Sequence, residues 1–183
     1  MSKKLWITLT VIMMVVIIVG CGANEQGGNH NPQNQEETNR ESEDILVIEH
    51  AMEPVEITGT PTKVVTLFQG ANDAAIQLGV KPVGAVESWV EKPWYEYIRD
   101  DMEGVENVGS ETQPNLELIV ELGPDLIIAA KSRHEEIYEQ LSAIAPTVMT
   151  EDHYHWQETL DLAAKALNKE AEAEAFMADW NEK

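Results

Sequence analysis

The sequence is poor in cysteine, in basic residues and in long apolar runs. Cys21 is the only cysteine in 183 residues, which excludes an intramolecular disulfide. There are 12 Lys and Arg against 33 Asp and Glu, a formal charge of -21, so nucleic acid and anionic lipid surfaces are poor partners by long-range electrostatics. The apolar run from Leu5 to Val19 is short for a membrane span. No G-x-S-x-G nucleophile motif occurs.

The N-terminus is typical of an exported protein. Lys3 and Lys4 precede the apolar run, as in a secretory signal peptide. The run ends in Ile18-Val19-Gly20-Cys21, which resembles a bacterial lipobox; an ordinary signal peptide with an incidental cysteine is the alternative. We therefore expect residues 1–20 to be a signal peptide. Acyl chains on Cys21 would then anchor the protein to the outer face of the cytoplasmic membrane.

The segment that follows is polar. Residues 22–44 are rich in Asn, Gln, Glu and Gly and hold almost no large apolar side chain, so they bury too little surface to offset their ordering entropy. With Cys21 they form a predicted disordered tether, residues 21–44. Residues 45–183 are about one domain's worth of chain, and we expect a monomer.

Apolar stretches alternate with helical patterns through the rest of the chain. We expect a hairpin from Ile45–Glu49 and Val55–Thr58, followed by five strands: Val64–Phe68, Val83–Val86, Val105–Val108, Asp125–Ala130 and Pro146–Met149. The predicted helices are Ala71–Leu78, Trp94–Arg99, Pro114–Leu122, Glu135–Ile144, Tyr154–Leu167 and Glu170–Lys183. Gly79 and Gly123 are expected to end two of them. This order predicts an α/β fold with a mostly parallel sheet flanked by helices.

A cationic cluster follows the most apolar predicted strand. Lys131, Ser132, Arg133 and His134 come directly after Asp125–Ala130. Ligands of open α/β sheets bind outside the carboxyl ends of the strands. The predicted ends are Gln69–Asn72, Glu87–Trp89, Gly109–Gln113, Lys131–His134 and Thr150–Trp156. The cluster therefore predicts one wall of an anion-binding cleft.

The individual side chains of this wall allow more than one interpretation. Ser132 and Glu135 form an S-x-x-E pattern, which predicts a helix cap. Such a cap puts Arg133 and His134 in a first helical turn, where positive charge is disfavoured unless an anion lies nearby. Lys131 is either a cleft cation or a solvated lysine. Trp89 either faces the ligand or belongs to the core, and we take Gln113 as a ligand contact at the neighbouring strand end.

Two other functions remain open on the residues alone. His153 and His155 form an H-x-H pattern that, with His134, would suit a metal-ion receptor, although Asp152 is a natural helix cap. A hydrolase would have only Ser132 near His134 as nucleophile and base, with no third group to orient the base. Trp156 lies on the apolar stripe of its predicted helix and is expected in the core.

Several motifs occur together in a recognisable order. They are Thr60-Pro61-Thr62-Lys63-Val64-Val65-Thr66-Leu67, Leu78-Gly79-Val80-Lys81-Pro82-Val83-Gly84, Val108-Gly109 through Gln113-Pro114-Asn115-Leu116-Glu117-Leu118-Ile119, Pro124-Asp125-Leu126-Ile127-Ile128, and Gln140 to Val148. With the lipobox and tether, they resemble the N-terminal half of iron-siderophore substrate-binding lipoproteins of ABC transporters. The block from Lys131 to Glu135 is most similar to the ferric citrate and hydroxamate branch.

The resemblance implies a receptor rather than an enzyme. Two α/β lobes joined by a long helix would hold a ferric siderophore, without a direct protein ligand to iron or a cofactor other than the Cys21 lipid. Arg133 and Lys131 would face the chelate, and Glu117 would contact the permease. On this interpretation residues 45–168 are the N-terminal lobe, residues 169–183 start the interlobe helix, and a C-terminal lobe is absent. We expect one lobe alone to bind ligand weakly.

Overall fold

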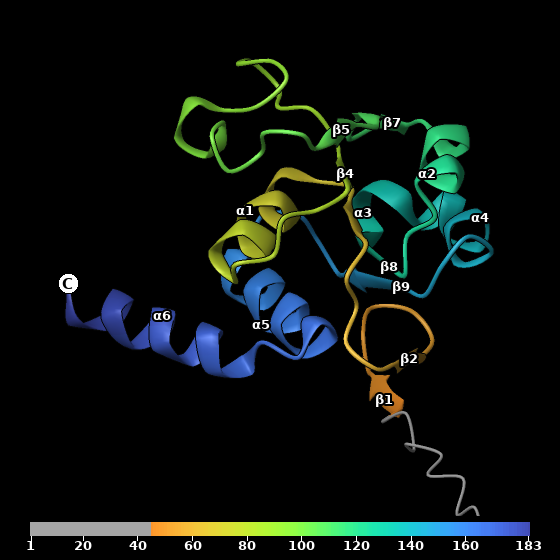
Figure 1. The fold of residues 1–183 in the computed structure, drawn as a ribbon. Coiled ribbons are helices and arrows are strands. Elements are labelled where there is room, and N and C mark those ends of the chain that lie inside the picture. Colours follow the sequence, from red (N-terminus) through yellow and green to blue (C-terminus); the bar gives the residue numbers. More distant parts are fainter. Residues whose placement is uncertain (1–44) are drawn as a thin grey trace, which may run out of the picture. The chain divides into compact units, whose positions relative to one another are not determined.

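The computed structural model describes residues 45–183 (Figure 1). The predictions for the signal peptide, Cys21 and the tether lie outside the described residues. None of the helices within residues 45–183 is long and apolar enough to cross a membrane.

A small hairpin precedes the main sheet. Strands β1 (Ile45–Ile48) and β2 (Val55–Thr58) pair antiparallel, with Ile45 opposite Thr58. Ile48 and Ile57 turn inward and are buried, while Ile45 and Val47 remain exposed. The predicted hairpin is therefore confirmed, and its alternation anchors one face on the core.

The main sheet has five parallel strands. They are β3 (Val64–Thr66), β4 (Gly84–Ala85), β5 (Glu106–Asn107), β8 (Leu126–Ala130) and β9 (Thr147–Thr150). Their spatial order is β5-β4-β3-β8-β9, and each neighbouring pair is parallel. This confirms the predicted sheet and places β5 at its edge. The strand order reverses between β3 and β8, which is where open α/β sheets bind their ligands.

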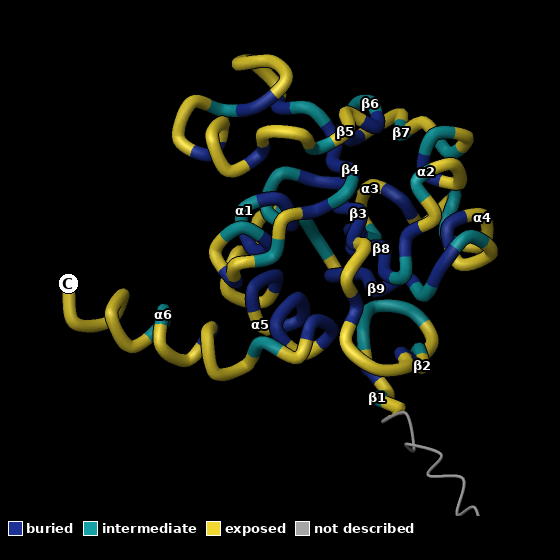
Figure 2. The backbone as a smooth tube through the Cα atoms, viewed as in Figure 1, coloured by how far each residue is buried: buried dark blue, intermediate teal, exposed yellow. Residues whose placement is uncertain are grey.

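Helices cover both faces of this sheet. Alternate residues of the buried strand β8 point to opposite sides and pack against different helices. Leu126, Ile128 and Ala130 belong to a core cluster that includes residues of helices α1 (Gln69–Gln77), α5 (Trp156–Leu167) and α6 (Glu170–Glu182). Ile127 and Ala129 pack with residues of α2 (Leu116–Leu122) and α4 (Tyr138–Ser142). Strands β3, β8 and β9 are correspondingly dark in the burial view (Figure 2). The α/β class is confirmed.

The ends of the helices follow local chemistry. Gly79, after α1, has φ of 74°, and Gly123 ends α2 in the left-handed region with φ of 57°, as expected. Helix α2 begins at Leu116 rather than at Pro114, because the Asn115 side chain accepts a hydrogen bond from Leu118 N at 3.1 Å. Pro114 lies instead in a short hairpin of β6 (Gly109–Ser110) and β7 (Gln113–Pro114), which the sequence analysis did not predict.

The segment after β8 corrects two predictions. The expected helix Glu135–Ile144 is a broken succession of α3 (Lys131–His134), the 3₁₀ turn η2 (Glu135–Ile137) and α4. Helix α3 begins directly after Ala130 with no side-chain cap, so the predicted Ser132 capping box is wrong. The helix begins one residue before Ser132, and the Ser132 hydroxyl therefore lies inside the first turn.

Two aromatic regions also differ from expectation. Residues Trp94–Arg99 contain only the 3₁₀ turn η1 (Glu96–Ile98), with Trp94 buried against Ile98 and Met102. Trp156 is 37% exposed, so its assignment to the core is wrong. It begins α5, and its ring meets Phe176 and Trp180 of α6 edge-on at 6.1 and 5.1 Å between centroids.

Candidate ligand-binding site

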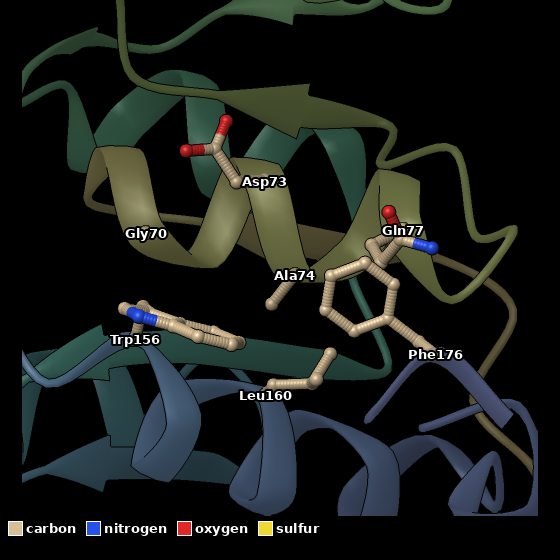
Figure 3. A pocket seen from close by; sticks show the side chains of 7 residues that line it. All are labelled: Gly70, Asp73, Ala74, Gln77, Trp156, Leu160 and Phe176. Atoms are coloured by element: carbon tan, nitrogen blue, oxygen red, sulfur yellow. The ribbon is translucent and has the colours of Figure 1, made fainter. Parts of the chain in front are cut away.

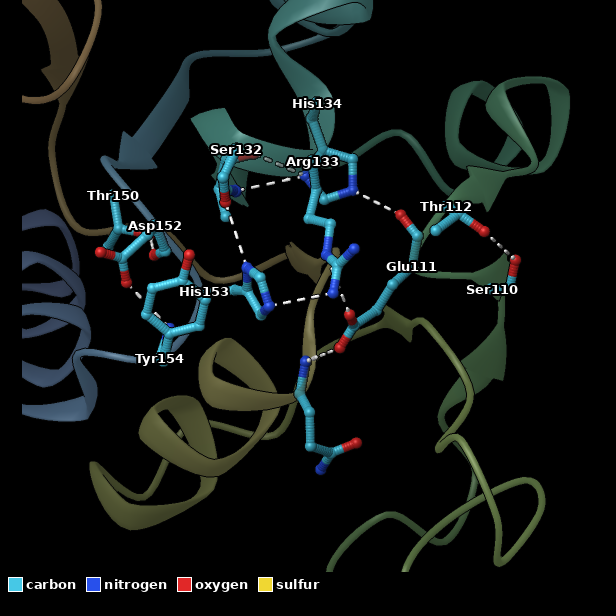
Figure 4. A network of polar contacts seen from close by, with 12 residues as sticks. Ser110, Glu111, Thr112, Ser132, Arg133, His134, Thr150, Asp152, His153 and Tyr154 are labelled. Carbon is cyan, nitrogen blue, oxygen red and sulfur yellow. Dashed lines mark hydrogen bonds and ion pairs between the residues drawn. The ribbon is translucent and has the colours of Figure 1, made fainter.

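The carboxyl ends of the parallel strands gather polar side chains from four segments, and Figure 4 shows those of the turn between β6 and β7, of α3 and of the loop after β9. Helix α3 follows β8, the loop 151–155 follows β9, and the turn between β6 and β7 follows β5. The fourth segment, residues 87–89, follows β4. All four segments were predicted as strand ends from the sequence, and the fold adds that they lie beside the reversal of strand order between β3 and β8.

Arg133 is at the centre of this group. Its Nη2 donates to His153 Nε2 at 2.9 Å, and its Nε lies 3.8 Å from Glu111 Oε2. Its guanidinium carbon lies 5.7 Å from the centroid of the Trp89 ring. The Arg133 side chain is 29% exposed. The guanidinium is thus held from three sides and retains access to solvent, as a cleft cation must.

Glu111 supplies an internal counter-ion. The residue is only 4% exposed. Its Oε1 accepts from Gln69 N, the first residue of α1, at 2.7 Å. A carboxylate is favoured at a helix N-terminus by the helix dipole. Its Oε2 has no hydrogen-bond partner and faces Arg133.

His134 is a structural residue in this geometry. It is 1% exposed. Its Nε2 donates to the Glu111 carbonyl at 2.8 Å, and its Nδ1 accepts from Ala130 N at 3.2 Å. Burial lowers the pKa of His134, so the neutral ring is favoured. Both ring nitrogens are engaged within the protein, so His134 has no free nitrogen to contact a ligand.

Trp89 opens one side of the site to solvent. It is 57% exposed, which answers the open question of core or surface. It borders a hollow of about 190 Å³, whose other lining residues are Glu87, Ser88, Lys92, Ser110, Glu111 and Thr112. Lys92 forms an ion pair with Glu87 and lowers the pKa of that carboxyl.

Lys131 and Ser132 border a second hollow, of about 360 Å³, together with Arg133, Glu135 and Glu136. Lys131 Nζ lies 3.4 Å from Glu151 Oε1. Ser132 Oγ lies 3.1 Å from His153 Nδ1, so the serine contacts the partner of Arg133 instead of capping a helix.

Besides His134, two predicted residues lie outside both hollows. Gln113 is exposed on β7, paired with Ser110, and is not among the lining residues of either hollow. Glu117 is exposed on the first turn of α2.

The histidines within the described residues do not form the cluster that a metal receptor would need. Within residues 45–183, no group of three His, Cys, Asp or Glu side chains could hold a metal ion. His155 pairs with Asp152 at 2.7 Å, and Asp152 Oδ1 accepts from Tyr154 N at 2.9 Å. Asp152 therefore orders the loop just before α5 rather than capping the helix itself, which begins at Trp156.

A further hollow lies between α1, α5 and α6 (Figure 3). The rings of Trp156 and Phe176 border it, and the Asp73 carboxylate points away from them. Burial raises the pKa of Asp73, which accepts from the Tyr97 hydroxyl at 2.8 Å. This hollow contains none of the predicted ligand contacts.

Glu111, Lys92 and the pairing of His153 with Arg133 were not predicted from the sequence. Glu111 lies in a predicted strand-end segment, but no periodicity marks an isolated acid in a tight turn as buried. His153 was considered only as a metal ligand, because the H-x-H pattern suggests one.

The known proteins that this chain resembles are described as binding proteins. A family model described as periplasmic binding protein matches residues 64–183. A probable siderophore-binding lipoprotein of Bacillus subtilis, YfiY, is 40% identical over 185 residues, covering 100% of this chain and 54% of the relative. The Fe(3+)-citrate-binding protein YfmC of the same organism is 36% identical over 183 residues, covering 97% of this chain and 56% of the relative.

A solved structure shows the same arrangement of elements. SirA of Staphylococcus aureus, complexed with staphyloferrin B, superposes with a TM-score of 0.73 at 53% identity, covering 74% of this chain and 47% of that chain. The chain thus spans about half the length of these relatives.

Proposed function

Because the chain belongs to the periplasmic binding protein family, we propose that it is the extracytoplasmic binding component of an ABC importer for a ferric siderophore. The relatives named for siderophore and Fe(3+)-citrate binding support this cargo. Ferric citrate or a related anionic chelate is the ligand that we propose. The observation that carries the proposal is the Arg133 guanidinium, held at the reversal of strand order and still open to solvent.

The proposed mechanism is capture without chemistry. A siderophore brings its own iron ligands, so the protein must recognise the outer oxygens of the chelate rather than the metal ion. The planar Arg133 fork suits carboxylate oxygens, and charge-assisted hydrogen bonds of this kind contribute about 1.5–3 kcal/mol each. Lys131 and Lys92 would add positive charge on the two sides, and the exposed Trp89 ring would contact the apolar parts of the chelate.

The remaining partners also belong to this proposal. Glu117 is exposed in the first turn of α2 and is available to arginines of a permease, although it also stabilises the helix N-terminus. Acyl chains on Cys21 would hold the protein at the outer face of the membrane. Both assignments follow from the resemblance to the binding-protein family.

A fluorescence titration tests the proposed function. Ferric citrate and a ferric hydroxamate are added to the purified protein, and tryptophan quenching is followed because Trp89 lies beside Arg133. We expect quenching by at least one chelate. Arg133→Ala should weaken binding at least about 10-fold, since it removes a charge-assisted contact.

The matched control is Lys165→Ala, which removes the same charge from an exposed pair with Asp161 on α5 and should leave affinity unchanged. Binding of zinc without binding of either ferric chelate would contradict the proposed function. Equal affinity of the Arg133→Ala variant and the parent would show that the chelate binds elsewhere.

A further inference from the structure

We propose that His153, in its neutral Nδ1–H form, and the buried carboxylate of Glu111 are positioning residues that fix the Arg133 guanidinium before a ligand arrives. This inference rests on the proposed function only in taking an anionic chelate as the ligand. The arrangement joins three segments that are distant in sequence: the turn between β6 and β7, helix α3 and the loop before α5 (Figure 4).

The contacts of His153 define which ring nitrogen carries the proton. Arginine nitrogens can only donate, so His153 Nε2, 2.9 Å from Arg133 Nη2, must be the acceptor. The proton of the neutral ring is then on Nδ1, which donates to Ser132 Oγ at 3.1 Å. Arg133 therefore selects this tautomer, and the Ser132 hydroxyl, which can donate or accept, is compatible with it.

Glu111 fixes the guanidinium from the opposite side. Its carboxylate is tied to the start of α1 through Gln69 N, and its backbone carbonyl accepts from the buried His134 ring. The turn that carries Glu111 is thus attached to two helices. Its second oxygen lacks a hydrogen bond and lies 3.8 Å from Arg133 Nε, so attraction to the guanidinium is the compensation available to this buried charge.

The consequence is a preorganised cation. A free arginine side chain loses rotamer freedom when a ligand immobilises it, and this loss weakens binding. In this site the side chain is already ordered by His153 and Glu111, while its remaining N–H groups are left for the chelate. Removal of the His153 acceptor should therefore weaken chelate binding roughly 3- to 10-fold, although His153 need not touch the ligand.

The test compares two substitutions at one position. His153→Leu removes the acceptor, whereas His153→Gln replaces Nε2 by an amide oxygen that can accept from Arg133. We expect His153→Leu to lose affinity for ferric citrate and His153→Gln to regain most of it, with the two variants unfolding at similar temperatures. Equal affinity of the parent and His153→Leu, or equal losses in both variants, would overturn the inference.

A measurement without ligand separates this inference from the proposed function. Long-range proton–nitrogen NMR of the ligand-free protein should show His153 protonated at Nδ1 and not at Nε2. The Arg133 side-chain N–H signals should exchange more slowly in the parent than in His153→Leu. An Nε2–H tautomer, or exchange that does not depend on His153, would overturn the positioning role even if the chelate binds. If no chelate binds, the proposed function fails, and these two spectra still decide the positioning.

Discussion

Replacement of His134 by alanine should destabilise the protein strongly, although the residue is not a proposed ligand contact. The side chain is 1% exposed and joins α3 to the turn between β6 and β7. The substitution removes the hydrogen bond to the Glu111 carbonyl and the one from Ala130 N. Each bond contributes about 1 kcal/mol, and unpaired buried groups add about 1–3 kcal/mol. We expect a total loss of about 3 kcal/mol.

The assay is urea unfolding followed by circular dichroism. A loss of this size corresponds to a thermal midpoint roughly 6–12 °C lower for a domain of this length. His155→Ala is the control, because His155 is exposed and, among the described residues, forms an ion pair only with Asp152 in the adjoining loop. The two variants remove the same side chain from a buried and an exposed position. If His134→Ala unfolds at the same urea concentration as His155→Ala, the structural role assigned to His134 is wrong.

Three further perturbations test other parts of the structure. Burial lowers the pKa of both His50 and His134 below 6.5, so the unfolded chain binds protons at a higher pH than the folded protein does. Stability should therefore fall as the pH drops below about 6.5. Urea midpoints that do not change between pH 8 and 5 would contradict this. Gly109→Ala should lower the free energy of unfolding by more than about 1 kcal/mol, since φ is 100° and a Cβ would lie 2.8 Å from the Gln113 carbonyl oxygen. Gly79→Ala should lower it less, because φ is 74° and the space around Gly79 is open. Thermal unfolding of both variants compares the two losses. Asn115→Ala should lose about 1 kcal/mol through the missing cap of α2, whereas Asn115→Asp should retain stability in the same assay.

The parallel sheet could be predicted from the sequence because its signals are local. The apolar residues of β8 follow a Gly-Pro break, and this pattern is sufficient to mark a buried strand. Gly123 marked the end of α2 correctly, because the left-handed conformation at that position favours glycine. The segments that follow the strands could then be placed at one edge of the sheet from topology alone.

The errors occur where tertiary contacts override a local pattern. Ser132 and Glu135 have the spacing of a capping box, but Ser132 N donates to Glu151 O at 3.2 Å in the fold, and the helix begins one residue earlier. Other apolar residues of the same helix, Leu160 and Leu167, are buried. At the first residue of α5, however, the neighbours are the aromatic rings of α6 and solvent. No local pattern indicates these long-range contacts.

The position of Glu111 affects how the proposed site would bind an anion. In dinucleotide-binding sheets, the N-terminus of the helix after the first strand holds a phosphate at the reversal of strand order. The corresponding helix here is α1, which follows β3, and its first N–H group is already occupied by the Glu111 carboxylate. On the proposed function, an incoming anion would therefore be bound by Arg133 rather than by this N–H group. Because Arg133 is held between Glu111 and His153, recognition of the proposed chelate would depend on side chains from α3, from the turn between β6 and β7 and from the loop before α5, rather than on the sheet itself.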